Sequence, residues 1–537
     1  MRSIEIPQPK DRDWRYRSFE ILPGALTWLI LFMPAILSLI SPQVASYFII
    51  GYLLLWFIRI IGFNIRALQG WRQLKQHRGL PWQKLNADLE ELVPRTANAP
   101  AWHARNLARV EKYIGHTRIK PSEVYHAIFV AFYNESKEIL EPTLEAILAS
   151  DYDKQKFILV LAYEARGGQP TEDLANQLLK KYGSRFYHSM AVKHPADMPG
   201  EIIGKGGNIT YAGHHFKKYI EKEGLDPLHV LVTTLDSDCR PDPQYFADLT
   251  YTYCSTEDPK HASYQPIAMY TNNIWDAPAP MRVVATGNAF YNVIFSMRPH
   301  ALRNFSAHAQ PLAALYDTDF WSVRTIVEDG HQFWRTYFRY DGQHQVYPIF
   351  MPIYQDAVLT DNYRRTLKAQ FIQIRRWAWG ASDVAYVAYM GFLKPNKISK
   401  PKLIAKFFRL LENHVSWATM PVILTLAAFV PFFLNPQSYI ANQLPHVVSR
   451  LNTVAIVGIF VSMYLSFQSL PPKPERYKRR RNFWMLVQWI YLPFTTLFYF
   501  AAAAIYAQTR LMFGWYIGKF DVTEKAVKHD RPDVKVM

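Results

Sequence analysis

Long apolar segments lie at both ends of the chain, and a mixed segment of apolar and polar residues separates them. Each run is about as long as the stretch that crosses the hydrocarbon core of a bilayer. The runs are 21–40, 44–63, 415–434, 454–470 and 483–507. After a short N-terminal segment, 1–20, the pattern predicts two transmembrane helices over 21–63 and a transmembrane region over 415–516, with the lipid bilayer as a partner.

The central part of the chain alternates short apolar runs with amphipathic helical patterns. Strands separated by helices of this length imply right-handed crossovers and a mostly parallel sheet with helices on both faces. The pattern therefore predicts an α/β domain over 126–393, joined to the first apolar runs by a polar connector, 64–125. The apolar runs lie at 127–132, 156–163, 185–192 and 229–235.

The segment 394–414 carries an apolar stripe at helical spacing beside basic residues. This combination favours an amphipathic helix in the membrane interface. The alternative is an ordinary helix packed on the domain. The stripe consists of Leu403, Phe407, Leu410 and Leu411.

The net charge of +17 does not indicate a nucleic-acid partner, because the basic residues cluster beside the apolar runs, as in 66–78 and 475–481. Neither an RNA-binding motif nor zinc-ligand spacing accompanies them, so nucleic acid is excluded as a partner. The positive-inside rule predicts an integral protein of the cell membrane whose N-terminus, central domain and tail, 517–537, are cytosolic. Cys239 and Cys254 lack metal-site spacing and are consistent with a reducing compartment.

Five single crossings do not leave the N-terminus and the tail on the same side of the membrane. Either the tail lies outside, or 483–516 turns back within the bilayer near Pro493 as a re-entrant hairpin. We favour the hairpin, because irregular backbone at membrane depth is tolerated where neighbouring helices cover it.

Two carboxylates, Asp236 and Asp238, come directly after the apolar run 229–235. Ligands in open α/β sheets bind at the carboxyl ends of the strands, and carboxylate oxygens suit a hard cation such as Mg²⁺ or Mn²⁺. A cation held by few carboxylates takes further oxygens from substrate phosphates, which indicates a nucleotide-diphosphate ligand. The alternative is a solvated turn.

Three further groups of residues are candidates for the chemistry. Glu328 and Asp329 precede a helical pattern, where a carboxylate acts as a general base or only as a helix cap. Lys205 in "GKGGN" could bind phosphate or belong to a simple turn. Within "QFIQIRRWAWG" (370–380), a guanidinium suits a diphosphate and an indole suits a sugar ring, although a basic helix at the membrane surface has the same composition.

Taken together, the motifs resemble those of the membrane-embedded family 2 glycosyltransferases, the group that includes bacterial cellulose, chitin and hyaluronan synthases. The resemblance implies a nucleotide-sugar-binding domain of the glycosyltransferase A type. The motifs that carry it, in chain order, are "VAFYNES" (130–136), "DSD" (236–238), "VED" (327–329), "QIRRW" (373–377) and "FDVTEK" (520–525).

The resemblance also implies roles for single residues. Asp236 would contact the nucleotide, Asp238 would hold the metal, and Asp329, beside Glu328, would be the catalytic base. Gln373 and Arg376 would hold the pyrophosphate, Trp377 would form the floor of the acceptor site, and Thr523 and Lys525 would cover the bound donor. One departure is "AYEARGG" (162–168), in which Glu164 replaces the family's uracil-contacting aspartate. UDP remains the expected nucleotide.

The expected function is a membrane-bound, metal-dependent, inverting hexosyl- or N-acetylhexosaminyltransferase that extends a polysaccharide from a nucleotide-sugar donor. A single transfer to a polyprenyl or other lipid-linked acceptor is the alternative within the same class. A non-catalytic scaffold that binds nucleotide-sugar or polysaccharide is the alternative from another class. A solute transporter is disfavoured, because the apolar runs contain few ionisable residues and a large α/β domain is present.

Overall fold

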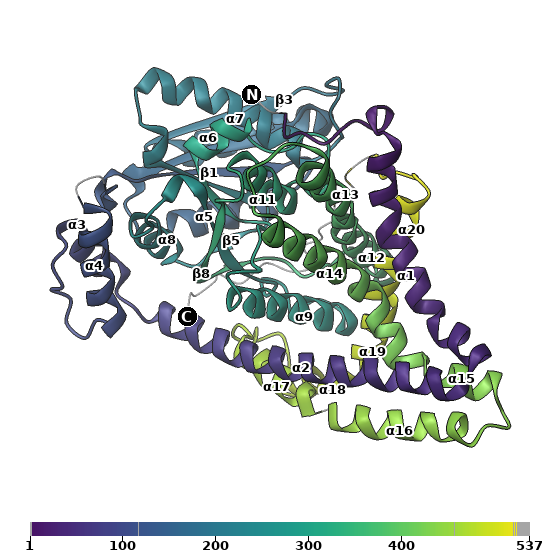
Figure 1. The fold of residues 1–537 in the computed structure, drawn as a ribbon. Coiled ribbons are helices and arrows are strands. Elements are labelled where there is room, and N and C mark those ends of the chain that lie inside the picture. The colour runs from purple at the N-terminus through teal and green to yellow at the C-terminus, as the bar shows by residue number, and fades with distance from the viewer. Residues whose placement is uncertain (1–2, 116–117, 456, 519, 521, 523–537) are drawn as a thin grey trace.

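A mixed sheet of eight strands lies at the centre of the computed structural model, which describes all residues except 1–2, 116–117, 456, 519, 521 and 523–537 (Figure 1). Its strand order is β3-β2-β1-β4-β7-β6-β8-β5. β1 pairs in parallel with β2 and β4, β2 with β3, and β6 with β8, whereas β7 and β5 run antiparallel to their neighbours. The strands are β1 (Tyr125–Phe132), β2 (Phe157–Glu164), β3 (His188–His194), β4 (Val230–Asp236), β5 (Arg240–Pro241), β6 (Ala262–Met269), β7 (Ala309–Pro311) and β8 (Gln345–Tyr354).

Helices cover both faces of this sheet, so the expected α/β class is confirmed. Ile128 and Val130 of β1 lie in the core beneath α5, α6 and α8, whereas Phe129 faces α7 and α10. This alternation explains why the strand is apolar throughout. The helices of the domain are α5 (Lys137–Leu148), α6 (Gly168–Tyr182), α7 (Lys205–Glu223), α8 (Tyr245–Cys254), α9 (Ala279–Ser296), α10 (Leu312–Thr318), α11 (Glu328–Arg339), α12 (Tyr363–Ala378) and α13 (Asp383–Ala388).

The connector contains two helices, α3 (Trp82–Glu91) and α4 (Ala101–Tyr113), that pack on α8. Trp82 and Leu107 are buried in the same core as β1 and β2. The part of the connector that contains α3 and α4 therefore packs on the core of the sheet.

Within the described residues, four helical stretches are long and apolar enough to cross a membrane: Trp14–Ile40, Pro42–Arg78, Tyr439–Gln468 and Arg480–Met512. The remaining apolar run, 415–434, is divided between α14 and α15. The helices outside the domain are α1 (Trp14–Ile40), α2 (Pro42–Arg78), α14 (Lys400–Leu426), α15 (Phe429–Leu434), α16 (Tyr439–Ala455), α17 (Val457–Gln468), α18 (Arg480–Val487), α19 (Leu492–Thr495) and α20 (Ala502–Met512).

Helix α9 lies between the sheet and α2 (Figure 1). The two helices approach closely at Gly70 of α2, where an added Cβ would lie 2.6 Å from a side-chain carbon of Val293. The domain and the apolar helices therefore pack against each other directly.

The apolar stripe of 394–414 is covered by protein. Leu403, Phe407, Leu410 and Leu411 of α14 are buried in one core with residues of α11 and α13. This packing corresponds to the alternative of a helix seated on the domain, and a position of this segment in the membrane interface stays a prediction.

The favoured re-entrant hairpin is wrong. Residues 480–512, all of which the structure describes, form one interrupted helical stretch that does not turn back at Pro493. It remains helical because a 3₁₀ turn at Gln488–Tyr491 and a π-helical turn at Thr496–Ala501 accommodate the proline. Both flanks contact the domain: Arg476 pairs with Asp276 at 2.9 Å, and the Phe520 N–H donates to the Ile203 carbonyl at 2.8 Å.

Candidate active site

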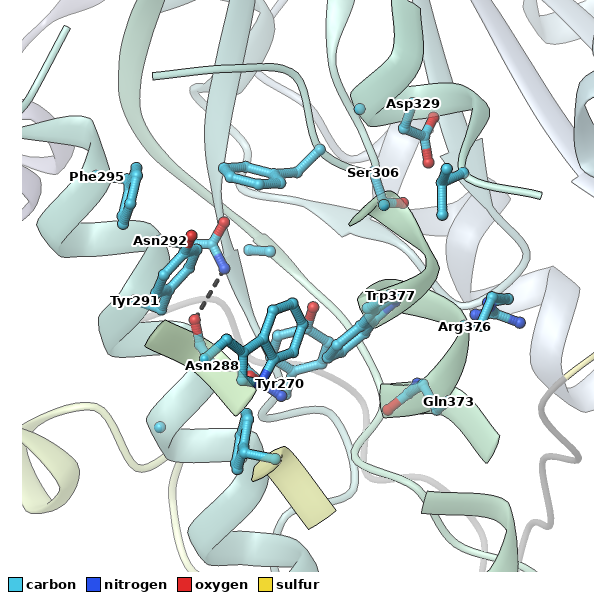
Figure 2. Close-up of a pocket in the computed structure, with 18 of the residues that line it drawn as sticks. Tyr270, Asn288, Tyr291, Asn292, Phe295, Ser306, Asp329, Gln373, Arg376 and Trp377 are labelled. Carbon is cyan, nitrogen blue, oxygen red and sulfur yellow. Dashed lines mark hydrogen bonds between the residues drawn. The ribbon is translucent and has the colours of Figure 1, made fainter. Parts of the chain in front are cut away.

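A cavity of about 1230 Å³ opens at the carboxyl ends of the parallel strands and extends between α9, α12, α14 and α2 (Figure 2). Nine of the residues singled out in the sequence line it, although they come from five separate parts of the chain. They are Glu164, Lys205, Asp236, Asp238, Glu328, Asp329, Gln373, Arg376 and Trp377. Thr523 and Lys525 lie outside the described residues.

Lys205, the first residue of α7, lies among three carboxylates and is buried. Its Nζ lies 2.9 Å from Asp236 Oδ1, 3.4 Å from Asp329 Oδ1 and 3.9 Å from Glu328 Oε1. Burial alone lowers the pKa of Lys205, but the three carboxylates outweigh it, and the net effect raises the pKa. The ammonium therefore stays charged and draws the ends of β4 and α11 together.

Glu328 and Asp329 begin α11, and the former is fully buried. Burial, followed by the adjacent charge of Asp329, raises the pKa of Glu328 to about 8 despite the opposing effect of Lys205. Glu328 therefore holds a proton more readily than an ordinary carboxyl, which limits the negative charge beside Asp329.

His308 lies behind Asp329, with its Nδ1 3.6 Å from Asp329 Oδ1. The indole Nε1–H of Trp321 donates to His308 Nε2 at 3.2 Å, which assigns the imidazole proton to Nδ1. That Nδ1–H then lies 3.0 Å from the Phe305 carbonyl oxygen. Burial is the main cause of a lowered pKa of His308, so the ring is neutral beside the carboxylate.

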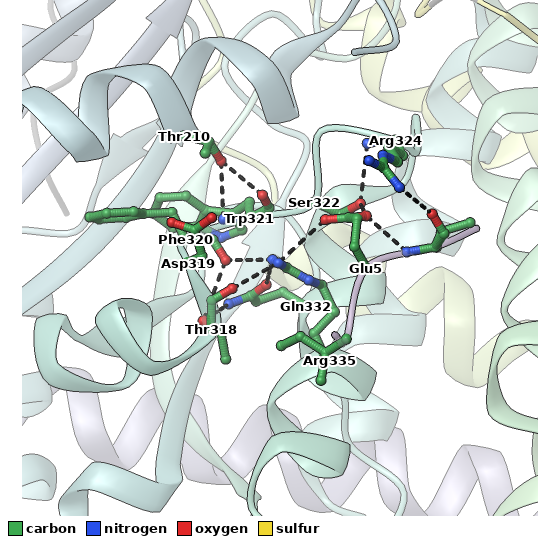
Figure 3. A network of polar contacts seen from close by, with 12 residues as sticks. Glu5, Thr210, Thr318, Asp319, Phe320, Trp321, Ser322, Arg324, Gln332 and Arg335 are labelled. Carbon is green, nitrogen blue, oxygen red and sulfur yellow. Dashed lines mark hydrogen bonds and ion pairs between the residues drawn. The ribbon is translucent and has the colours of Figure 1, made fainter. Parts of the chain in front are cut away.

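A polar network holds α11 and the preceding loop in place (Figure 3). Arg335 of α11 donates to the carbonyls of Thr318 at 2.7 Å and Phe320 at 2.5 Å. It also pairs with Glu5 at 3.4 Å, and Glu5 accepts a hydrogen bond from Ser322. The N-terminal segment is thus tied to the helix that carries Glu328 and Asp329.

The two aspartates after β4 are held by different partners. Asp236 Oδ2 accepts from the Ser306 hydroxyl at 2.7 Å, and Asp238 Oδ2 accepts from the Asp356 N–H at 2.9 Å. No group of three His, Cys, Asp or Glu side chains suited to a metal occurs among the described residues. The carboxylates fit a hard cation that takes most of its oxygens from a substrate.

Helix α12 supplies Gln373, Arg376 and Trp377, which face the cavity together (Figure 2). The Trp377 ring lies 6.3 Å from that of Tyr270, measured between centroids. The Arg376 guanidinium lies 3.9 Å above the Phe520 ring. Phe520 also lies against Gly204, where an added Cβ would be 2.9 Å from its Cβ.

Sequence reasoning missed Tyr270, Ser306 and His308. Tyr270 follows β6, a strand that the hydrophobic pattern did not predict. Ser306 and His308 belong to the segment after α9, which has no motif in the sequence. Phe520 is the first residue of the motif "FDVTEK", but it was not among the predicted site residues.

The sequence matches no family model, and no curated protein is significantly similar to it. Solved structures of glycosyltransferases are its neighbours at low identity. A mannosyltransferase of Pyrobaculum calidifontis in complex with GDP-Man and Mn²⁺ is 12% identical, with a TM-score of 0.39 over 84% of this chain and 99% of that chain. Residues 1–349 of TarS from S. aureus are 11% identical, with a TM-score of 0.36 over 73% of this chain and 91% of that chain.

Proposed function

We propose that the protein is a membrane-bound inverting glycosyltransferase that transfers a sugar from a nucleotide-diphosphate sugar to a growing polysaccharide. The observation that carries the proposal is the meeting of nine motif residues from distant parts of the chain in one cavity at the carboxyl ends of the strands. UDP is the proposed nucleotide, contacted by Glu164 and Asp236.

Asp329 is the proposed catalytic base. It takes the proton of the acceptor hydroxyl, whose oxygen forms the new bond to the anomeric carbon of the sugar. The bond from that carbon to the diphosphate breaks, and the electron pair leaves with the nucleoside diphosphate. A base opposite the leaving group gives in-line displacement, and therefore inversion of configuration.

The remaining residues position the reactants. Gln373 and Arg376 hold the leaving diphosphate, and Trp377 is the floor of the acceptor-sugar site. Lys205 fixes Asp236 and Asp329 relative to each other, as its 2.9 and 3.4 Å contacts indicate. Catalysis then rests on orientation and on neutralising the diphosphate.

Asp238 is the residue proposed to hold Mg²⁺ or Mn²⁺. When bound, the ion would supply positive charge to the diphosphate. Asp238 lines the same cavity as Arg376, so an ion held by Asp238 and the guanidinium would both be available to a diphosphate bound there.

The tail is proposed to close over the donor from the cytosolic side. Its described part supports this proposal, because Phe520 lines the cavity and packs on Arg376 and Gly204. Thr523 and Lys525 follow within five residues and would cover the nucleotide-sugar.

Sugar transfer in native membranes tests this function. Membranes with the wild-type protein receive radiolabelled UDP-, GDP- and dTDP-sugars with Mg²⁺ or Mn²⁺, and the product is sized. Asp329→Asn should lower transfer by about a hundredfold or more and leave donor binding intact, because it removes only the base. Asp238→Asn should lower both. The matched control is Asp319→Asn, which changes an exposed aspartate of a second D-x-D sequence.

Two results would contradict the proposal. Full activity of Asp329→Asn would remove the assignment of the base. Nucleotide-sugar binding by the wild type without transfer from any donor would favour the non-catalytic scaffold.

A further inference from the structure

A second charged region lines the cavity away from the carboxylates. Five partly buried arginines from three parts of the chain converge there, and we refer to them as the arginine cluster. Two belong to α2, two follow α9, and one belongs to α14. They are Arg59, Arg66, Arg298, Arg303 and Arg409.

The arginine cluster has far more positive than negative charge. Among the described residues, Glu412, which pairs with Arg59, is the one carboxylate in ion-pair contact with it. Burial, followed by the charges of Arg66, Arg409 and Arg59, lowers the pKa of Arg298, and the Nε of Arg298 is buried without a hydrogen-bond partner. Such a concentration of like charge is unfavourable unless an anion occupies it.

Apolar side chains border the arginine cluster on α2 and α14. Ile58 is 69% exposed and Phe408 is 61% exposed, and both line the cavity. Of the two cluster arginines on α2, Arg59 lies inside the apolar run 44–63 and Arg66 lies just beyond it, and both belong to the candidate membrane-spanning helix Pro42–Arg78. Ionisable residues are rare in membrane-spanning helices, and those that occur usually belong to a binding site or a transport pathway. An occupant would therefore present a negative group to the arginines and an apolar part to the bilayer.

One segment joins the arginine cluster to the carboxylates. It begins at Arg298, after the end of α9, and reaches Ser306 and His308, which contact Asp236 and Asp329 respectively. The two regions also share one cavity, which Tyr291, Asn292 and Phe295 of α9 line as well (Figure 2). A molecule held at the cluster could reach Asp329 through the cavity.

We propose that the arginine cluster binds the phosphate or diphosphate headgroup of a membrane lipid that carries the acceptor saccharide. The lipid chain lies along Ile58 and Phe408, and the saccharide extends toward Asp329 and Trp377. This proposal rests on the function proposed above and names the anchor of its acceptor. The bonds formed and broken are unchanged, because the acceptor hydroxyl still loses its proton to Asp329.

A free phosphate or an acidic polymer would satisfy the arginines but not the exposed apolar border. A polymer without a lipid would also make no apolar contact with the membrane helix. Guanidinium groups bind phosphate through paired, charge-assisted hydrogen bonds, which suits several arginines around one headgroup.

The test uses the full chain in lipid nanodiscs and a polyprenyl diphosphate that carries a photoreactive group on its prenyl chain. Crosslinking to the wild type is compared with Arg298→Gln, Arg409→Gln and the double variant. Arg95→Gln is the matched control, because Arg95 is exposed and pairs only with Glu91 on the surface. Donor binding is measured in parallel. We expect about a tenfold or greater loss of crosslinking in the double variant, with unchanged donor binding and unchanged crosslinking in the control.

Competitors identify the source of the phosphate. Unlabelled polyprenyl diphosphate should displace the probe, whereas equal amounts of phosphatidylglycerol or inorganic pyrophosphate should not. Equal displacement by either would overturn the proposal, because the cluster would then bind phosphates without regard to the lipid.

The outcomes also separate this proposal from the proposed function. Arginine-dependent crosslinking without sugar transfer would support the lipid site and contradict the enzyme. Sugar transfer into water-soluble polymer alone, with crosslinking unchanged in the double variant, would support the enzyme and contradict the lipid site.

Discussion

Lys205→Met should destabilise the protein strongly, and more so at alkaline than at acidic pH. The substitution keeps the shape of the side chain but removes the charge that lies 2.9 Å from Asp236 and 3.4 Å from Asp329. Each attraction is worth about 5–6 kcal/mol at an effective dielectric constant of 20, and desolvation offsets part of this energy. Removing one partner of a fully buried ion pair costs about 3–5 kcal/mol, and solvent screening makes the cost smaller here because the Asp236 side chain is 37% exposed.

The pH dependence follows from the groups that remain. Lys205 has a raised pKa, so in the wild type its stabilising charge is fully present throughout the range from pH 5.5 to 8. In the variant, Glu328 loses the opposing charge of Lys205, so its pKa, which burial already raises, rises further, and the folded state binds more protons than the unfolded state. The stability of the variant therefore falls as the pH rises, by at most about 3 kcal/mol per carboxyl between pH 5.5 and 8.

The assay is the apparent melting temperature in detergent at both pH values. We expect a loss of roughly 5–10 °C at pH 8 and a smaller loss at pH 5.5. Lys217→Met, in the same helix, is the control, because its contact with Glu221 is an exposed pair of little energetic value. An equal loss at both pH values, or a loss no larger than that of the control, would refute the idea that Lys205 compensates buried carboxylates.

Two further predictions concern the same cavity. Because the pKa of Glu328 is raised to about 8, Glu328 should become negatively charged as the pH passes 8, and wild-type transfer should fall because this charge repels the diphosphate. The Glu328→Gln variant should keep its rate over the same pH range. If the pH profiles of the two proteins superimpose, the titrating group is another residue. Trp377→Ala should raise the acceptor KM about tenfold or more and leave donor affinity unchanged, with Trp377→Phe recovering part of the loss; an equal loss for donor and acceptor would indicate a structural tryptophan.

About half of the sheet could be predicted from the sequence. β1, β2 and β4 are parallel strands that are buried over nearly their whole length, which gives each a clear local signal. β3 is a half-buried edge strand, and its apolar run, 185–192, still gives a local signal. β8 contains Pro348 and Pro352, and β6 contains Gln265 and Pro266, so neither has the continuous pattern of a strand. β5 and β7 are two and three residues long and form only through pairing with distant strands.

The candidate site divides in the same way. Residues in motifs could be selected without a structure, because each motif is a short local pattern. The contact of Lys205 with Asp329 joins residues 124 positions apart and could not be predicted from spacing. Ser306 and His308 reach the carboxylates only because the chain after α9 folds back to the ends of the strands.

The basic residues beside the apolar segments show that one sequence pattern can have two physical causes. The positive-inside rule explains such residues by their preference for the cytosolic side of the membrane, and it predicts nothing about the groups that they contact. Arg66 fits that rule and Arg59 lies inside the apolar run 44–63, but the structure places both in the arginine cluster. Among the described residues, Glu412 is the one carboxylate in ion-pair contact with these five guanidinium groups. An arginine that only sets the topology is stabilised by the water around its charge, whereas a partly buried cluster of arginines is stabilised by a bound anion. Anion binding depends on the way this fold brings the five arginines together, and lipid crosslinking to the Arg298 and Arg409 variants measures that binding.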